Sequence, residues 1–182
     1  DVNFGMYPRD REVAQIIVEM REKYNWPTSI CGSTGKNNKE RIIDITSVFG
    51  DSFEVSMATQ SMDGQVLENV RRSNIQLDHF REINKHLKKV GRATSGDIII
   101  GLPGESKESF IKGALDLLDS GIQRIVIYSL MMLYGTEFKD PGYRARFNMK
   151  GKYRIIPLNC GEYDGEKIFD YEEICIETKD MS

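Results

Sequence analysis

The feature of this chain that most constrains its fold is a regular alternation of strand-like and helix-like segments. Apolar residues recur at helical spacing in residues 9–24, 36–49, 63–70, 80–90 and 106–118. Shorter runs typical of strands occupy residues 28–31, 53–59, 94–100 and 123–131. Strand followed by helix, repeated with short connections, predicts an α/β fold with a parallel sheet and right-handed crossovers. A barrel and a doubly wound sheet satisfy this pattern equally well.

The alternation stops near Leu133, where glycine and proline become frequent. We therefore expect residues 1–138 to carry the sheet and its helices. Residues 139–182 are predicted to form an irregular C-terminal extension that caps this unit and contains one late strand, Tyr171–Thr178. The extension is locally basic, which we interpret as a solvated surface, with an acidic substrate or partner as the alternative.

The composition excludes several classes of protein. Because the net charge is −3 and the pI about 5.5, we expect no general attraction to nucleic acid or to a membrane surface. The longest apolar run, Ile125–Leu133, is too short to span a membrane. Cys31, Cys160 and Cys175 do not make a disulfide framework, so a reducing, cytoplasmic location is the simplest interpretation. The first residues resemble the end of a strand, and we expect the protein to extend upstream.

Small, amide and hydroxyl side chains gather where the predicted strands end, which is where parallel α/β folds place their sites. These ends are Asn3-Phe4-Gly5, Cys31-Gly32-Ser33-Thr34-Gly35, Thr59-Gln60-Ser61, Gly101-Leu102-Pro103-Gly104-Glu105 and Ser129-Leu130-Met131-Met132. The spacing of Gly32 and Gly35 does not match a P-loop. Simpler interpretations make Gln60-Ser61 a capping sequence, Gly101–Glu105 an ordinary strand-to-helix turn, and Cys31 a small buried thiol.

Taken together, these segments resemble the radical S-adenosylmethionine (SAM) superfamily, and most of all its branch with an upstream cobalamin-binding domain. Asp1-Val2-Asn3-Phe4 is similar to the segment that ends the second barrel strand of that family. Gln60-Ser61-Met62-Asp63, followed by Val66-Leu67 and Arg71-Arg72, resembles its fourth-strand signature. The run from Asp97 to Ser106 resembles its fifth-strand signature. Tyr134-Gly135-Thr136 matches the Pro-Gly-Thr after the sixth strand, except at Tyr134.

The resemblance implies a partial parallel (β/α) barrel, incomplete relative to a TIM barrel, in which SAM binds across the strand ends and chelates a [4Fe–4S] cluster. A reductant protein such as ferredoxin or flavodoxin would supply the electron that cleaves SAM to a 5′-deoxyadenosyl radical. This radical would drive methylation or other chemistry on a small-molecule or peptide substrate, with cobalamin held by an upstream domain. The protein itself would position these cofactors and exclude water.

The same resemblance assigns cofactor-binding roles residue by residue. Asn3 and Phe4 would lie near the methionine amino group of SAM, and Gln60 and Ser61 would face its ribose or methionine part. Arg72 would bind the methionine carboxylate through a charge-assisted contact. Ile99 to Gly101 would line the adenine of SAM, and Ser129 to Met131 would offer backbone hydrogen bonds to the edge of the adenine. Ser56 is the last member of the predicted cofactor-binding set.

One departure from the family pattern limits what this stretch does alone. The family holds its cluster with Cys-x-x-x-Cys-x-x-Cys, and no two cysteines here lie within that spacing. We therefore expect the cluster ligands to lie upstream and this chain alone to be inactive. The alternatives are a non-catalytic barrel remnant that acts as a binding module and an unrelated aldolase-type or doubly wound enzyme.

Overall fold

The structure is a computed structural model that describes residues 4–33, 39–50, 53–73, 77–89 and 94–182. The first elements in chain order are α1 (Arg9–Tyr24), β1 (Ile30–Ser33), α2 (Lys39–Phe49), β2 (Phe53–Gln60), α3 (Gly64–Asn69), α4 (Leu77–Lys89), β3 (Thr94–Ile100), α5 (Lys107–Asp119) and β4 (Arg124–Ser129). They are followed by the 3-10 helix η2 (Glu137–Lys139), α6 (Pro141–Arg146), β5 (Lys150–Tyr163) and β6 (Glu166–Glu177). The predicted alternation of strands and helices is therefore confirmed as far as β4.

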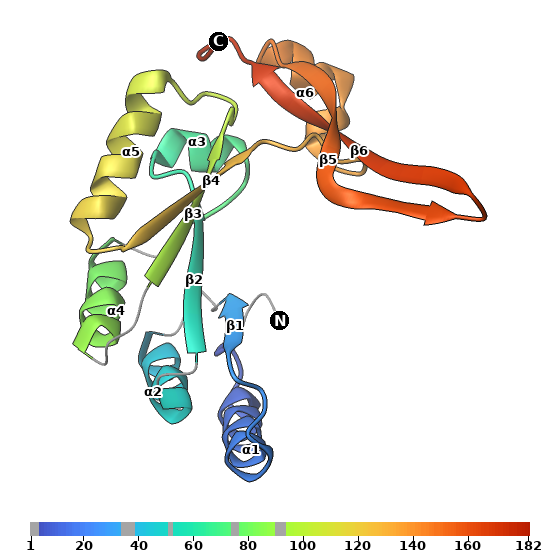
Figure 1. The fold of residues 1–182 in the computed structure, drawn as a ribbon. Helices are drawn as coiled ribbons and strands as arrows, with labels where there is room; N and C mark the ends of the chain where they lie inside the picture. The colour runs from blue at the N-terminus through green and yellow to red at the C-terminus, as the bar shows by residue number, and fades with distance from the viewer. Residues whose placement is uncertain (1–3, 34–38, 51–52, 74–76, 90–93) are drawn as a thin grey trace.

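The strands β1 to β4 form one parallel sheet in which chain neighbours are also spatial neighbours (Figure 1). The register places Ile30 beside Phe53 and Ser95 beside Arg124. Because side chains alternate between the two faces of a strand, Phe53 and Ile98 point toward the helices, whereas Ser56 and Asp97 lie on the other face. The sheet thus has one apolar face and one face with polar side chains.

The main hydrophobic core lies between the apolar face of the sheet and α1, α2, α4 and α5. Its buried members include Ile42, Ile45, Phe53, Ile83, Leu87, Ile98 and Leu117. Burial of one such side chain contributes roughly 1.5–3 kcal/mol. The predicted apolar residues attach α2 and α4 to the sheet, whereas α1 packs mainly through Ala14, with Ile17 and Val18 partly buried. The predicted face of α1 at Val13, Ile16, Met20 and Tyr24 is exposed instead.

Two helices begin at side-chain caps directly after strand ends. The Asp63 carboxylate accepts hydrogen bonds from the amides of Gln65 at 2.9 Å and Val66 at 3.1 Å, at the start of α3. Ser106 and Ser109 form a reciprocal capping box at the start of α5. Such caps stabilise a helix by about 0.5–2 kcal/mol, and here they fix the turns that leave β2 and β3.

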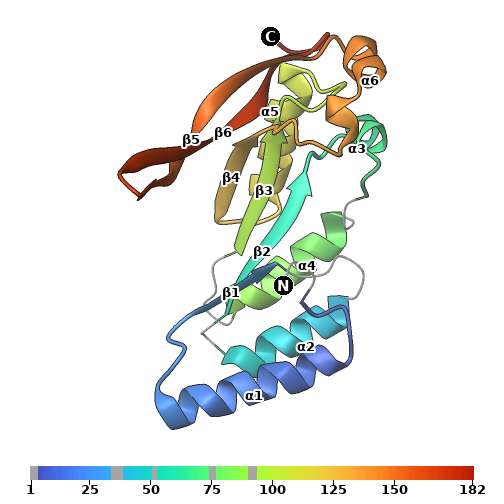
Figure 2. The same cartoon turned by 90° about the vertical axis from the view of Figure 1, so that its right-hand side faces the viewer.

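The prediction of an irregular C-terminal extension is wrong. Residues 150–177 form a long antiparallel hairpin of β5 and β6, which extends away from the sheet in Figures 1 and 2. The expected strand Tyr171–Thr178 lies almost entirely within β6. The hairpin turns at Asp164-Gly165, where φ is 50° and 77°, the two positive values that a tight type I′ turn requires.

The hairpin is attached to the sheet by backbone pairing just beyond β4. The Cys175 amide donates to the Leu130 carbonyl at 2.9 Å, and the Met132 amide donates to the Glu173 carbonyl at 2.8 Å. A second hydrophobic cluster covers this junction and contains Val66, Leu102, Leu130, Met132, Phe147, Met149 and Cys175. The extension therefore packs on the strand-end side of the sheet.

Ion pairs within the extension involve four of its eight Lys and Arg side chains. Arg144 lies 3.1 Å from the buried Glu173 carboxylate, which Lys139 also contacts. The hydrogen bond from Lys139 is the main reason why the pKa of Glu173 is lowered. Lys150 and Arg154 pair with acids of β6 at 2.7 Å. The cross-strand pairs give Lys150 and Arg154 a structural role in the hairpin.

Among the described residues, no helix is long and apolar enough to cross a membrane.

Candidate functional site

The carboxyl ends of β1 to β4 lie at the same edge of the sheet, because the four strands are parallel. At this edge the strands end in Ser33, Gln60, Ile100 and Ser129. The polar contacts of the described chain that join one strand end to another are concentrated around Gln60. We therefore take this edge as the candidate site.

Gln60 forms a strained turn at the end of β2. Its φ is +63°, and the amide of Ser61 donates to the carbonyl of Thr59 at 2.8 Å, which closes a three-residue γ-turn. The pairing of β2 with β3 also shifts register between Ala58 and Gln60. A non-glycine residue in such a conformation costs of order 1–3 kcal/mol and persists only where its surroundings hold it.

Arg72 contacts this turn directly. Its Nε donates to the Gln60 Oε1 at 2.9 Å, and its backbone amide donates to the Leu67 carbonyl at 2.8 Å. The short helix α3 thus brings the chain back over the end of β2. Arg72 and Gln60, which were predicted to bind the same cofactor, are adjacent in the structure.

Behind the turn lies a buried carboxyl group that the sequence-based reasoning did not assign to the site. The Ser61 hydroxyl donates to Glu105 Oε1 at 2.6 Å and accepts from the Asp63 amide at 3.1 Å. Glu105 is 1% exposed, and its Oε2 has no hydrogen-bond partner among the described residues. The pKa of Glu105 is raised to about 7, mainly by burial, with the hydrogen bond from Ser61 lowering it and the nearby charge of Asp63 raising it.

This contact also revises two simpler interpretations of the strand ends. Asp63, not Gln60-Ser61, caps α3. Glu105 precedes the Ser106 cap of α5 and points toward Ser61, so it is not an exposed acid that stabilises a helix start. Because 44 residues separate Ser61 from Glu105, no local sequence pattern marks their contact.

On the polar face of the sheet, Ser56 and Asp97 connect β2 with β3. The Ser56 hydroxyl donates to Asp97 Oδ2 at 3.1 Å, and the Thr59 hydroxyl donates to the Asp97 carbonyl at 3.0 Å. Ser56 therefore lies on the polar face of the sheet, four residues before Gln60 along β2.

The predicted residues of β3 and β4 lie on the hairpin side of the edge. Ile99 is half-buried against the second hydrophobic cluster, and Gly101 has a φ of +91°, which glycine adopts without strain. Ser129 ends β4, and Met131, 41% exposed, pairs with Ile174 of the hairpin.

Part of the predicted backbone segment at the end of β4 is already used within the protein. The Leu130 amide donates to the Ile100 carbonyl at 3.0 Å, and its carbonyl accepts from the Cys175 amide. Leu130 is therefore a poorer backbone partner for a ligand than Ser129 or Met131.

The two predicted cofactor-binding residues at the chain start are Asn3 and Phe4. Asn3 lies outside the described residues. The ring of Phe4 packs in the main core, 5.8 Å from the centroid of Phe49 and 6.1 Å from that of Phe53. Its amide donates to the Ser33 carbonyl at 3.1 Å, so its backbone, not its ring, reaches the strand ends.

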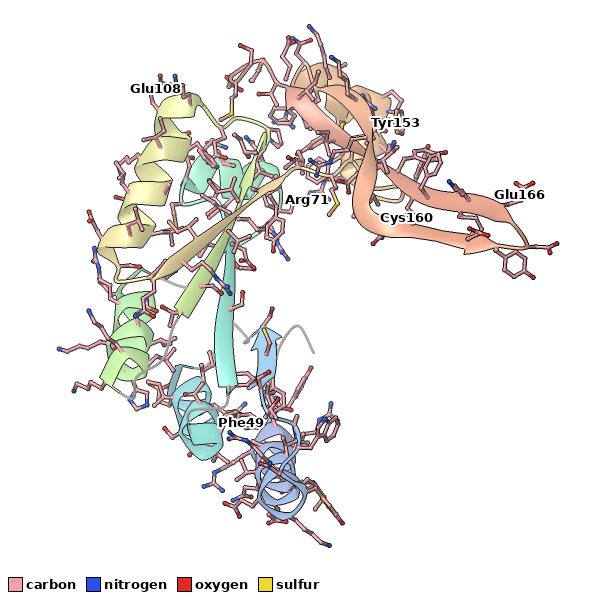
Figure 3. All side chains as sticks on the ribbon, in the orientation of Figure 1. Phe49, Arg71, Glu108, Tyr153, Cys160 and Glu166 are labelled. Atoms are coloured by element: carbon pink, nitrogen blue, oxygen red, sulfur yellow. The ribbon has the colours of Figure 1, made fainter. Side chains whose placement is uncertain are left out.

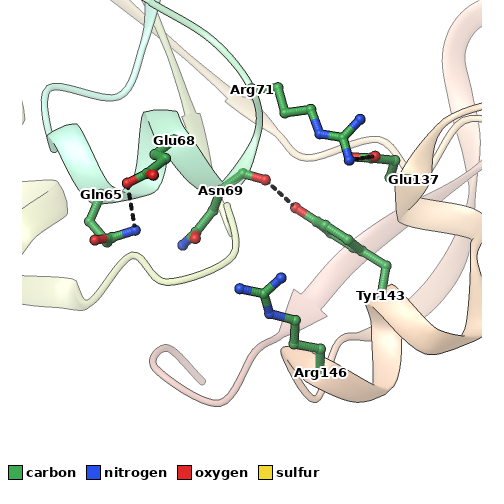
Figure 4. A pocket seen from close by; sticks show the side chains of 7 residues that line it. All are labelled: Gln65, Glu68, Asn69, Arg71, Glu137, Tyr143 and Arg146. Atoms are coloured by element: carbon green, nitrogen blue, oxygen red, sulfur yellow. Dashed lines mark hydrogen bonds and ion pairs between the residues drawn. The ribbon is translucent and has the colours of Figure 1, made fainter.

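A hollow of about 280 Å³ lies between α3 and α6 (Figure 4). It is lined by Gln65, Glu68, Asn69, Arg71, Glu137, Tyr143 and Arg146. Arg71 pairs with Glu137 at 2.8 Å, and the Tyr143 hydroxyl donates to the Asn69 carbonyl at 2.7 Å. Burial is the main reason why the pKa of Tyr143 is raised. The ion pair and the hydrogen bond connect the extension to the end of α3 and to Arg71 just beyond it. Because the lining contains two acidic and two basic side chains, the hollow favours neither an anionic nor a cationic ligand.

The cysteines do not form a metal site in the part of the chain that the structure describes. Cys31 is exposed on the edge strand β1, so the prediction of a buried thiol is wrong at that position. Cys160 is exposed on the hairpin (Figure 3), and Cys175 is buried. Within the described ranges, no three His, Cys, Asp or Glu side chains are grouped so that they could hold a metal ion.

Comparison with known proteins adds relatives in one enzyme family. No family model matches the sequence. The chain is 32% identical over 154 residues to the cobalamin-dependent radical SAM methyltransferase TokK of Streptomyces tokunonensis, a match that covers 82% of this chain and 23% of that protein. It is 30% identical over 190 residues to the 2-(S-pantetheinyl)-carbapenam-3-carboxylate methyltransferase of Streptantibioticus cattleyicolor, covering 100% of this chain and 27% of that protein.

The chain belongs to the radical SAM superfamily. The similarity to TokK, a cobalamin-dependent member, supports the cobalamin-dependent branch and sets aside the alternative of an unrelated α/β enzyme. The chain spans about a quarter of the length of these curated relatives.

Solved structures of radical SAM enzymes share the fold. The methyltransferase TsrM of Kitasatospora setae, determined with tryptophan and a SAM analogue, aligns with a TM-score of 0.64 and 11% identity, covering 87% of this chain and 32% of that one. The radical SAM enzyme HemN, the coproporphyrinogen III oxidase of Escherichia coli, aligns with a TM-score of 0.56 and 20% identity, covering 67% of this chain and 29% of that one. The α/β fold with a parallel sheet is therefore common to this chain and radical SAM enzymes.

Proposed function

We propose that this chain supplies the SAM-binding strand ends of a cobalamin-dependent radical SAM methyltransferase, and that its sheet is part of an incomplete (β/α) barrel. The observation that carries the proposal is the state of Arg72. Its Nε is held by Gln60, whereas neither of its Nη atoms has a hydrogen bond or ion pair among the described residues. A guanidinium held in this way can present paired N–H donors to a carboxylate, such as that of the methionine part of SAM.

The described residues fit SAM better than they fit an iron–sulfur cluster. The strand ends combine a guanidinium and an amide with the exposed apolar side chain of Ile100, which suits a ligand with a charged end and an aromatic base. In contrast, the described residues contain no group of metal-ligating side chains. We propose that the cluster ligands lie upstream of this sequence, and we assign no step of the reaction to residues here through the cluster.

The contribution of this chain to the reaction is binding and orientation. SAM bound beside a [4Fe–4S] cluster would supply the radical chemistry, and cobalamin on an upstream domain would act as the methyl carrier. Arg72 and Gln60 hold the methionine end of SAM, with Ser56 on the polar face of β2. Ser61, whose hydroxyl is buried against Glu105, supports the turn from behind. Ile99 and Gly101 line its adenine, and Ser129 and Met131 offer backbone groups to the edge of that ring.

The remaining components of the proposal come from the relatives and from the resemblance of the sequence. The names of the two curated relatives support transfer of a methyl group. A small-molecule or peptide acceptor and a one-electron donor protein, such as ferredoxin or flavodoxin, complete the reaction.

The proposal is tested by SAM affinity in matched arginine variants. We expect Arg72→Ala to weaken SAM binding about 10- to 100-fold, because a hydrogen bond to a charged group contributes about 1.5–3 kcal/mol. Arg71→Ala is the control, since the neighbouring Arg71 is exposed and pairs with Glu137 instead. Equilibrium dialysis with radiolabelled SAM, on the reconstituted protein that includes the upstream region, measures both. Equal affinities in the two variants would contradict the proposed role of Arg72.

A further inference from the structure

The Gln60 turn requires support from outside its own residues. A γ-turn with φ of +63° at glutamine is intrinsically unfavourable, so the chain leaves this conformation unless other contacts hold it. Side chains from outside the turn contact it on both sides: Arg72 donates to the Gln60 amide, and Glu105 accepts from the Ser61 hydroxyl. Arg72 is exposed, whereas Ser61 and Glu105 are 2% and 1% exposed. The rigid support therefore comes from the buried side.

The buried contact connects two adjacent strand ends. Glu105 stands in the turn from β3 to α5, and Ser61 stands in the turn from β2 to α3. The Ser61 hydroxyl is simultaneously a donor to Glu105 and an acceptor from the Asp63 amide, so its orientation is fixed from both sides. A bond of 2.6 Å between two buried groups lies at the short end for hydroxyl and carboxyl oxygens.

We propose that Glu105 is a positioning residue, which holds the Gln60 turn through Ser61 and thereby sets Gln60 and Arg72 for the ligand carboxylate. The proposal rests on the proposed SAM site, but it concerns a residue that touches neither SAM nor the reacting atoms. Glu105 acts through two contacts in sequence: Glu105 to Ser61, and the Gln60 side chain to Arg72.

The protonation state of Glu105 gives this role a characteristic pH dependence. Its pKa is raised to about 7, mainly by burial and also by the nearby charge of Asp63, against the hydrogen bond from Ser61. Above that pH the carboxyl group becomes a buried anion whose Oε2 has no partner in the described chain. The charged form accepts more strongly from the Ser61 hydroxyl but leaves this second oxygen unpaired. We therefore expect the support of the turn, and SAM affinity with it, to change as the pH rises from 6 to 8.

Three variants separate positioning from general loss of structure. Glu105→Gln keeps the shape and an acceptor for the Ser61 hydroxyl but cannot ionise, and Glu105→Ala removes the contact. Glu108→Gln is the matched control, because Glu108 is exposed in the first turn of the same helix α5 (Figure 3). Thermal melting of each variant reports whether the fold is retained.

The experiment combines a ligand-free and a ligand-bound measurement. The Nε–H resonance of Arg72 in nitrogen-15 NMR reports its bond to Gln60 without SAM, and equilibrium dialysis reports SAM affinity at pH 6, 7 and 8. We expect Glu105→Ala to shift the Arg72 resonance toward that of a free side chain and to weaken SAM about tenfold, as loss of a supporting partner does elsewhere. Glu105→Gln should keep both properties and lose the pH dependence, and Glu108→Gln should match the unmodified protein.

Failure of this proposal is distinguishable from failure of the proposed function. If Glu105→Ala folds and leaves the Arg72 resonance and the pH profile unchanged, Glu105 does not position the site, whether or not SAM binds. If the unmodified protein does not bind SAM, the proposed function fails, and the Arg72 resonance still decides the role of Glu105.

Discussion

The buried carboxyl of Glu105 predicts an unusual pH dependence of folding stability. Its pKa rises from the usual 4.5 to about 7 on folding, so the folded state retains a proton that the unfolded chain loses. The associated stability is fully present below pH 4.5 and is lost as the pH rises through 7. One pKa unit corresponds to about 1.36 kcal/mol, which gives about 3 kcal/mol in total, and allowance for solvent screening reduces the expected value to about 2 kcal/mol.

The comparison that isolates this contribution uses Glu105→Gln, which is neutral at every pH. Urea unfolding followed by circular dichroism at pH 5, 6, 7 and 8 gives the free energy of unfolding of both proteins. We expect the unmodified protein to lose about 2 kcal/mol relative to Glu105→Gln between pH 5 and pH 8. The difference between the two proteins is informative because all other titrating groups cancel. Parallel stability curves would refute the assignment of a buried, proton-retaining carboxyl at this position.

Two further predictions concern the turns and the thiols. Gly104→Ala should destabilise the protein by about 1–3 kcal/mol, because φ is +89° and a Cβ would meet the Asn69 amide, whereas Gly64→Ala, where a Cβ meets no atom, should not; urea unfolding of both variants tests this. Cys31 and Cys160 are exposed and should react rapidly with iodoacetamide, whereas Cys175 is buried with a raised pKa and should react slowly; mass spectrometry over time measures the three rates, and equal rates would contradict the burial of Cys175.

The sheet and its helices could be predicted because their signals are periodic and local. Apolar residues at helical spacing gave α1 its bounds, Arg9–Tyr24, and the continuous apolar run gave β3 its bounds, Thr94–Ile100. Asp63 and Ser106, the first residues of the segments 63–70 and 106–118, cap α3 and α5, because capping depends on residues close in sequence.

The hairpin was missed although one of its signals is present. Asp164-Gly165 is a strong signal for a tight hairpin turn. The flanking strands lack apolar alternation because much of the hairpin is exposed on both faces, and cross-strand pairs such as Arg154 with Glu172 help to hold it. The frequent glycine and proline residues therefore led to the prediction of an irregular extension.

The candidate site was predictable in its location but not in its internal contacts. Parallel strands determine that Gln60 and Gly101 lie at one edge. The positive φ of Gln60 and the bond between Ser61 and Glu105 depend on how β2 and β3 are aligned in space, and the register shift next to Gln60 is not visible in the sequence.

The central claim is that this chain is part of an enzyme that binds SAM beside a [4Fe–4S] cluster. Anaerobic iron–sulfide reconstitution followed by EPR tests this claim most directly. It should be done in parallel on this chain and on the gene extended upstream by about 150 residues, roughly one more domain. We expect a reduced [4Fe–4S] signal that SAM perturbs, seen only in the extended protein. We also expect Arg72→Ala to require more SAM for the same perturbation, whereas Arg71→Ala should not. A cluster in neither protein, or a cluster signal that SAM leaves unchanged, would contradict the proposed function.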